Sequence, residues 1–209
     1  MARCGATKLK TGECHALGIA LALIALAYSV DSYSTPAIAQ HHASKQKAQK
    51  PKTDAELIAS AMSAAPLAVS KDATIVAVGS DGKLRTLRQG QGGFTCVPDD
   101  PNTPGNDPMC LDRNGLEWFK ALLAHENPPE GKVWIAYMLK GGSDASNDDP
   151  FASEPQAGKK WVQTGPHVMI GGPGITKMLD RYTTSADDTR RPYIMFGGTR
   201  YEHVMLPVQ

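Results

Sequence analysis

Short apolar runs rich in β-branched and aromatic residues divide the chain after residue 73. They end at Gly, Pro or polar turn residues and comprise residues 74–78, 83–88, 94–97, 132–139, 165–170 and 201–208. Runs of this length between turn formers predict β-strands. Asp81 and Gly82 separate the first two runs, which predicts a β-hairpin, and we expect the first three strands to form an antiparallel meander. The pattern therefore predicts a mainly antiparallel sheet.

Apolar residues recur at helical intervals in only a few segments of the sequence. Residues 112–125 place apolar side chains at helical spacing and are followed closely by Pro128, which predicts a helix. A shorter helix is predicted over residues 54–64. We therefore expect a single α+β domain over residues 54–209, with one or two helices packed on the sheet and long polar loops between the elements.

The N-terminal segment predicts export. Basic residues precede an apolar run at residues 16–27, and Ala37-Ile38-Ala39 supplies a small-x-small cleavage pattern. This order is typical of a signal peptide, here residues 1–39, and predicts a periplasmic or secreted protein. The alternative is an uncleaved membrane anchor, because the gap before the cleavage pattern is long. Residues 40–53 contain little to bury and predict a flexible leader, and no transmembrane segment is predicted in the mature chain.

Charge and motifs narrow the class of function. Without residues 1–39 the chain carries 19 basic and 19 acidic residues, and this balance argues against nucleic-acid binding. No Gly-x-Ser-x-Gly or His-Glu-x-x-His motif supports an enzyme, although Ser, His and Asp are all present. We therefore expect a non-catalytic binding or structural module that contacts a partner protein or a small-molecule ligand.

Two cysteines remain after the predicted signal peptide. Cys96 and Cys110 are separated by 13 residues rich in Pro and polar side chains. In an exported chain such a pair predicts a disulfide. The alternative is a reactive thiol, but the spacing is not Cys-x-x-Cys and no basic partner lies nearby in the sequence.

Two acidic loops carry oxygen ligands. The loop at residues 98–108 contains several Asp and Asn side chains, which suit Ca²⁺, but its order departs from the EF-hand spacing. The loop at residues 141–159 offers Asp144, Asn147 and Asp148 as a possible ligand set. Turn formation explains the same residue types in both loops, so both interpretations stay open.

Two predicted strands each carry the sequence His-Val-Met. Side chains alternate along a strand, so His167 shares a face with Met169, and His203 shares a face with Met205. Imidazole and thioether together favour copper, especially Cu(I), over hard cations. These four residues are therefore candidate metal ligands, with Met178 as a possible fifth. The alternative is that the methionines fill the core and each histidine is a buried polar residue.

Methionine also occurs in a repeated local pattern. Met138, Met169 and Met195 each lie in an apolar run that ends in Gly-Gly. If the three strands ran in the same direction, their glycine pairs would line one edge of the sheet. The alternative is that the glycines mark three separate strand exits into turns.

Several segments resemble a family of exported bacterial proteins. They are Phe94-Thr95-Cys96, Pro108 to Asp112, Gly141 to Asn147, Gly165-Pro166-His167 and Tyr201 to Val208. This resemblance extends over residues 73–209 and implies export and a single domain, and it implies no reaction.

A second resemblance is local. Ten residues separate His167 from Met178, and 24 residues separate Met178 from His203-Val204-Met205. This spacing is similar to the ligand pattern of periplasmic copper chaperones, although the second interval is longer here. The resemblance implies a shared ligand chemistry, so copper binding is the alternative to the non-catalytic binding or structural module.

Overall fold

The structure, a computed structural model, describes residues 52–178 and 180–208. The predicted signal peptide and most of the predicted leader lie outside these residues. The described residues belong to one compact unit, Ala48–Gln209. None of their helices is long and apolar enough to cross a membrane.

Eight strands form the main sheet in the order β2-β1-β3-β4-β5-β8-β10-β9. Strands β6 and β7 pair separately, and four helices accompany the strands, so the α+β class is confirmed. The strands are β1 (Thr74–Val78), β2 (Leu84–Arg88), β3 (Phe94–Val97), β4 (Met109–Asp112), β5 (Trp134–Met138), β6 (Gly142–Asp144), β7 (Val162–Thr164), β8 (His167–Gly171), β9 (Tyr193–Met195) and β10 (His203–Pro207). The helices are α1 (Asp54–Met62), α2 (Leu67–Ser70), α3 (Arg113–Ala124) and α4 (Ile175–Met178).

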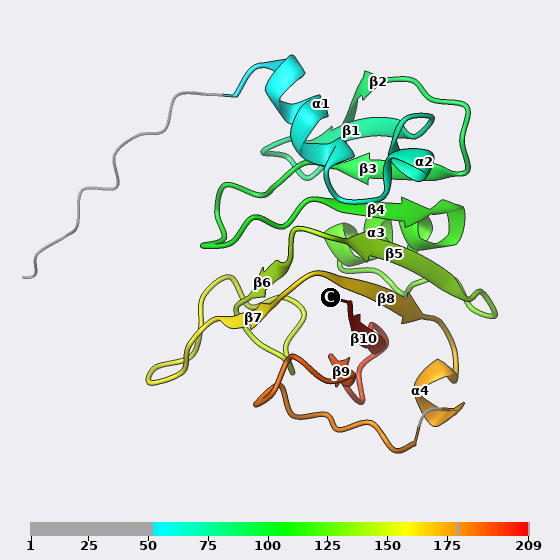
Figure 1. Cartoon of the computed structure of the whole chain (residues 1–209). Coiled ribbons are helices and arrows are strands. Elements are labelled where there is room, and N and C mark those ends of the chain that lie inside the picture. Colours follow the sequence, from blue (N-terminus) through cyan, green and yellow to red (C-terminus); the bar gives the residue numbers. More distant parts are fainter. Residues whose placement is uncertain (1–51, 179, 209) are drawn as a thin grey trace, which may run out of the picture. The chain divides into compact units, whose positions relative to one another are not determined.

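The two faces of the sheet bury different cores. On β1, β3 and β4, neighbouring residues alternate between two apolar clusters, as strand geometry requires. One cluster contains Ile75, Cys96 and Cys110 with alanines of the α1 segment. The other contains Leu111 and Trp118, and Trp118 belongs to α3. Figure 1 shows α1 and α2 in front of the sheet and α3 behind β4 and β5, which fits this division.

The first three strands do not form the predicted antiparallel meander. β1 pairs with β2 in antiparallel orientation, as the hairpin prediction required, but β1 and β3 are parallel. After β2 the chain returns past the start of β1, where Gln91 and Gly92 donate backbone hydrogen bonds to Asp72. This return lets β3 run beside β1 in the same direction, so the prediction for this pair was wrong.

The predicted helix at residues 112–125 is present with slightly shorter bounds. Asp112 caps its start, because the carboxylate accepts the backbone N–H of Gly115 at 2.7 Å. His125 ends α3 in the left-handed conformation, with φ of 57°. Its ring stacks on Phe151 at 4.0 Å between centroids. The segment before the cap, Met109–Asp112, is strand β4, which the sequence pattern did not predict.

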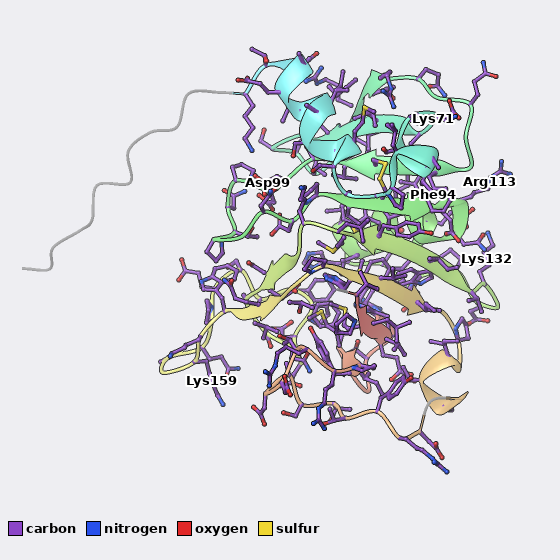
Figure 2. The ribbon with its side chains drawn as sticks, viewed as in Figure 1. Lys71, Phe94, Asp99, Arg113, Lys132 and Lys159 are labelled. Carbon is purple, nitrogen blue, oxygen red and sulfur yellow. A yellow bond between two sulfur atoms is a disulfide. The ribbon has the colours of Figure 1, made fainter. Side chains whose placement is uncertain are left out.

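The predicted disulfide joins β3 and β4. Cys96 and Cys110 are paired across the two strands and bonded through their sulfur atoms. Both residues are fully buried between the sheet and the α1 segment. Figure 2 shows this bond in yellow, and it fixes the two ends of the loop that carries Asp99.

Candidate ligand pocket

The face of the sheet that packs against α3 carries a row of methionine and histidine side chains. Met169 of β8 lies directly opposite Met205 of β10. His203 lies opposite Met195 of β9 on one side and Gly171 of β8 on the other. Directly opposite residues of an antiparallel pair point to the same face, so these side chains are neighbours.

The four predicted metal ligands share this face, but the structure does not bring them all together. His167, Met169, His203 and Met205 are each at most 4% exposed. The two methionines are partners, whereas His167 pairs with Pro207 on β10 and with Met138 on β5. Four residues along the ladder separate the positions of the two histidines, which is roughly 13 Å along the strands. Each imidazole therefore lies next to a different methionine, and the side chain of Met178 lies outside the described part.

Met138 and Met195 are neighbours of the histidines that the ligand prediction omitted. The repeated Met and Gly-Gly pattern was the sequence signal that contained them. β8 and β9 are both antiparallel to β10 and so run in the same direction, while β5 runs opposite to β8. The glycine pair after Met138 consequently lies at the other end of the ladder, and the three pairs do not line one edge.

Both histidines present an unprotonated ring nitrogen. Nδ1 of His167 lies 2.7 Å from the Gly165 carbonyl oxygen, and Nδ1 of His203 lies 2.9 Å from that of Tyr201. A carbonyl only accepts, so Nδ1 carries the proton in each ring and Nε2 carries the lone pair. Each Nε2 is buried and has no hydrogen-bond partner among the described residues.

Burial keeps both rings neutral. Loss of solvation lowers the pKa of His203 to about 4 and also lowers the pKa of His167. Aromatic side chains surround the His203 ring, with centroids of Trp118, Trp134 and Phe196 at 5.4, 5.5 and 5.6 Å. At neutral pH, His203 is therefore a fixed, uncharged acceptor in an apolar setting.

A pocket of about 560 Å³ opens over this face. We call it the sulfur-lined pocket, because five methionines contribute to its wall: Met109, Met138, Met169, Met195 and Met205. His203 also lines it, together with Trp118, Phe119 and Phe196. The volume is within the range of small-molecule sites, which are mainly apolar with a few polar groups.

Part of the pocket wall is polar. We define the polar end as Asp107, Ser143 and Asp144, all of which line the pocket. Burial, with a contribution from the nearby Asp107 carboxylate, raises the pKa of Asp144 to about 7. Burial likewise raises the pKa of Asp107, against the opposing effect of its hydrogen bond from Thr103. The Ser143 hydroxyl is buried without a hydrogen-bond partner among the described residues.

The two predicted oxygen-ligand loops use most of their oxygens locally. In the first loop, Asp100 accepts the backbone N–H of Asn102 at 2.9 Å, and Asp99 accepts that of Asp107 at 3.1 Å. Lys52 also forms an ion pair with Asp99 at 2.8 Å. These contacts are the expected turn chemistry.

In the second loop, one predicted ligand residue connects other segments of the chain and another lines the pocket. Asn147 donates to the carbonyl oxygens of Thr184 and Ile194 at 2.7 and 3.2 Å, so it connects two other segments of the chain. Asp148 is exposed, and of the three predicted residues only Asp144 lines the pocket. Across residues 52–178 and 180–208, no three His, Cys, Asp or Glu side chains are grouped to hold a metal ion.

Comparison of the chain with protein-family models, with curated proteins and with solved structures finds no match. The resemblances read from the sequence therefore stay predictions. The function is inferred from the geometry of the pocket itself.

Proposed function

We propose that this protein is an exported, non-catalytic binding module that holds a small, mainly apolar ligand in the sulfur-lined pocket. The observation that carries the proposal is the pocket of about 560 Å³, with a methionine and aromatic wall and one unpartnered imidazole nitrogen at His203. Methionine side chains adapt to the shape of an apolar ligand, and the His203 nitrogen gives such a ligand a fixed hydrogen-bond acceptor. The buried Cys96–Cys110 disulfide supports export into an oxidising compartment.

Titration with N-phenyl-1-naphthylamine, a neutral fluorescent probe, tests the proposal. Met109 is half-buried and lines the pocket, so Met109→Trp should fill part of it and weaken probe binding by about tenfold or more. Ile135 is 39% exposed and does not line the pocket, so Ile135→Trp is the matched control and should bind as wild type does. Equal probe affinity in wild type and Met109→Trp would count against the pocket.

Copper(I) binding is a second candidate, favoured by one specific observation. Nε2 of His203 has no hydrogen-bond partner among residues 52–178 and 180–208, and Met195 and Met205 are its neighbours on the same face. Its Nδ1–H bonds a backbone carbonyl, the arrangement that orients a metal-binding histidine. Imidazole and thioether donors suit Cu(I). His167, next to Met138, has the same tautomer but does not line the pocket.

A further inference from the structure

The charged side chains in the wall of the sulfur-lined pocket are of one sign. Among the described residues that line it, Asp99, Asp100, Asp107 and Asp144 are carboxylates and none is Lys or Arg. An apolar cleft lined by one sign of charge concentrates ligands of the opposite sign. The pocket thus combines an apolar wall with a negative field.

Three of these carboxylates already have partners. Asp99 forms an ion pair with Lys52 and accepts a backbone N–H, and Asp100 accepts the backbone N–H of Asn102. Asp107 accepts the hydroxyl of Thr103 and the backbone N–H of Asp100. Among the hydrogen bonds and ion pairs of the described residues, the Asp144 side chain takes part in none, although it is half-buried.

A second observation is independent of the carboxylates. The hydroxyl of Ser143, a residue 6% exposed, is buried in the pocket wall and has no hydrogen-bond partner in the described part of the chain. It packs against Gly105, where an added Cβ would lie 2.1 Å from the Ser143 oxygen. Buried polar atoms normally have partners, so an oxygen without one indicates a ligand donor. Elsewhere in the pocket wall, Nε2 of His203 is likewise an acceptor without a donor among the described residues.

We propose that the pocket binds a hydrophobic amine, with its ammonium group at the polar end beside Asp144 and Ser143 and its apolar body among the methionines. This inference rests on the proposed function and specifies the class of ligand. An ammonium carries three N–H donors, which match the free carboxylate and the free hydroxyl. It also neutralises charge where Asp107 and Asp144 repel each other.

Three ligands with one apolar body and different head groups test the inference. We would titrate the full chain by calorimetry with 4-phenylbutylamine, 4-phenylbutanol and 4-phenylbutyrate. The amine should bind about tenfold or more tightly than the alcohol, since a charge-assisted hydrogen bond contributes about 1.5–3 kcal/mol. The anion should bind most weakly. This comparison uses the wild-type protein and depends on no variant.

Substitutions then locate the head group. Asp144→Asn and Ser143→Ala should each weaken binding of the amine more than binding of the alcohol, because the alcohol makes only neutral hydrogen bonds at the polar end. Asp187 is exposed and does not line the pocket, so Asp187→Asn should bind all three ligands as wild type does. Equal binding of the three ligands would overturn the amine inference and leave the pocket proposal standing. Failure of all three ligands and of the naphthylamine probe would overturn both.

Discussion

Met169 of β8 and Met205 of β10 are directly opposite each other in the sheet, and both lie in the wall of the sulfur-lined pocket. Each is at most 4% exposed. His203 lies two residues before Met205 on β10 and is opposite Met195 in the neighbouring β10–β9 ladder. The register of two adjacent strand pairs thus assembles one imidazole and three thioethers on one face.

Removal of His203 should abolish Cu(I) binding at this assembly, if the second candidate function holds. We expect His203→Ala to lose Cu(I) to a chelator, because the imidazole is the nitrogen donor at the site. His167→Ala should retain Cu(I), because its position is roughly 13 Å away along the strands. Competition against a Cu(I) chelator measures both variants. Equal retention by wild type and His203→Ala would rule out the site.

The disulfide should stabilise the fold measurably. A closed loop of the size between Cys96 and Cys110 contributes about 3 kcal/mol in the chain-entropy model. We therefore expect Cys96→Ser to lower the free energy of unfolding by about that amount, as measured by urea denaturation without reductant. Detection of two free thiols in unreduced wild-type protein would contradict the pairing.

Local sequence pattern accounted for much of this fold. Short apolar runs between turn formers predicted most strands of the main sheet, and helical spacing with Pro128 predicted α3. The cysteine pair was also predictable, because export and spacing leave a single partner for each. Strand β4 was not predicted, because its four residues directly follow a Pro- and Asn-rich loop and form too short an apolar run to be recognised beside it.

Pairing between distant strands could not be predicted in the same way. The parallel β1–β3 pair depends on where the chain after β2 returns, which no local pattern encodes. The same limit applies to the site. The alternation rule placed His203 and Met205 on one face, but the proximity of Met195 follows from strand order. Asp144 was one of many polar loop residues, and only the fold distinguishes it from exposed Asp148.

The neutral burial of His203 should make stability depend on pH. Its pKa is about 4 in the folded chain, against 6.5 for an ordinary histidine. Protonation of His203 is therefore less favourable in the folded state than in the unfolded state. The contribution of neutral His203 to stability is complete above pH 6.5 and is lost as pH falls through about 4. Between these values the loss is about 1.4 kcal/mol per pH unit. His203→Asn does not titrate and retains a side-chain N–H donor.

Denaturation of both proteins at pH 7 and pH 4.5 isolates this contribution. The free energy of unfolding should fall more in wild type than in His203→Asn over this interval. His167 is present in both proteins and its pKa is also lowered, but its charge acts on His203, so the same comparison is repeated in a His167→Asn background. Parallel pH profiles would contradict the burial of an uncharged His203.

Asp144 should act on stability in the opposite direction. Its pKa is about 7 in the folded chain, against 3.8 for an ordinary aspartate, because partial burial removes solvation from the carboxylate and the Asp107 charge lies nearby. The folded state therefore binds the Asp144 proton more tightly than the unfolded state does. The contribution of protonated Asp144 to stability is present below pH 3.8 and is lost as pH rises through about 7. Asp144→Asn carries no charge at any pH and should become more stable than wild type as pH rises from 4 to 8.

The gain should reach about 1–2 kcal/mol at pH 8, less than the full pKa difference implies, because Asp144 is only half-buried and water screens part of its charge. Urea denaturation of wild type and Asp144→Asn at pH 4, 6 and 8 measures it, with Asp187→Asn as the exposed control. The amine ligand should remove the difference between wild type and Asp144→Asn at pH 8, because it neutralises the carboxylate that destabilises wild type. A pH-independent difference between Asp144→Asn and wild type would contradict a raised pKa of Asp144 in the folded chain.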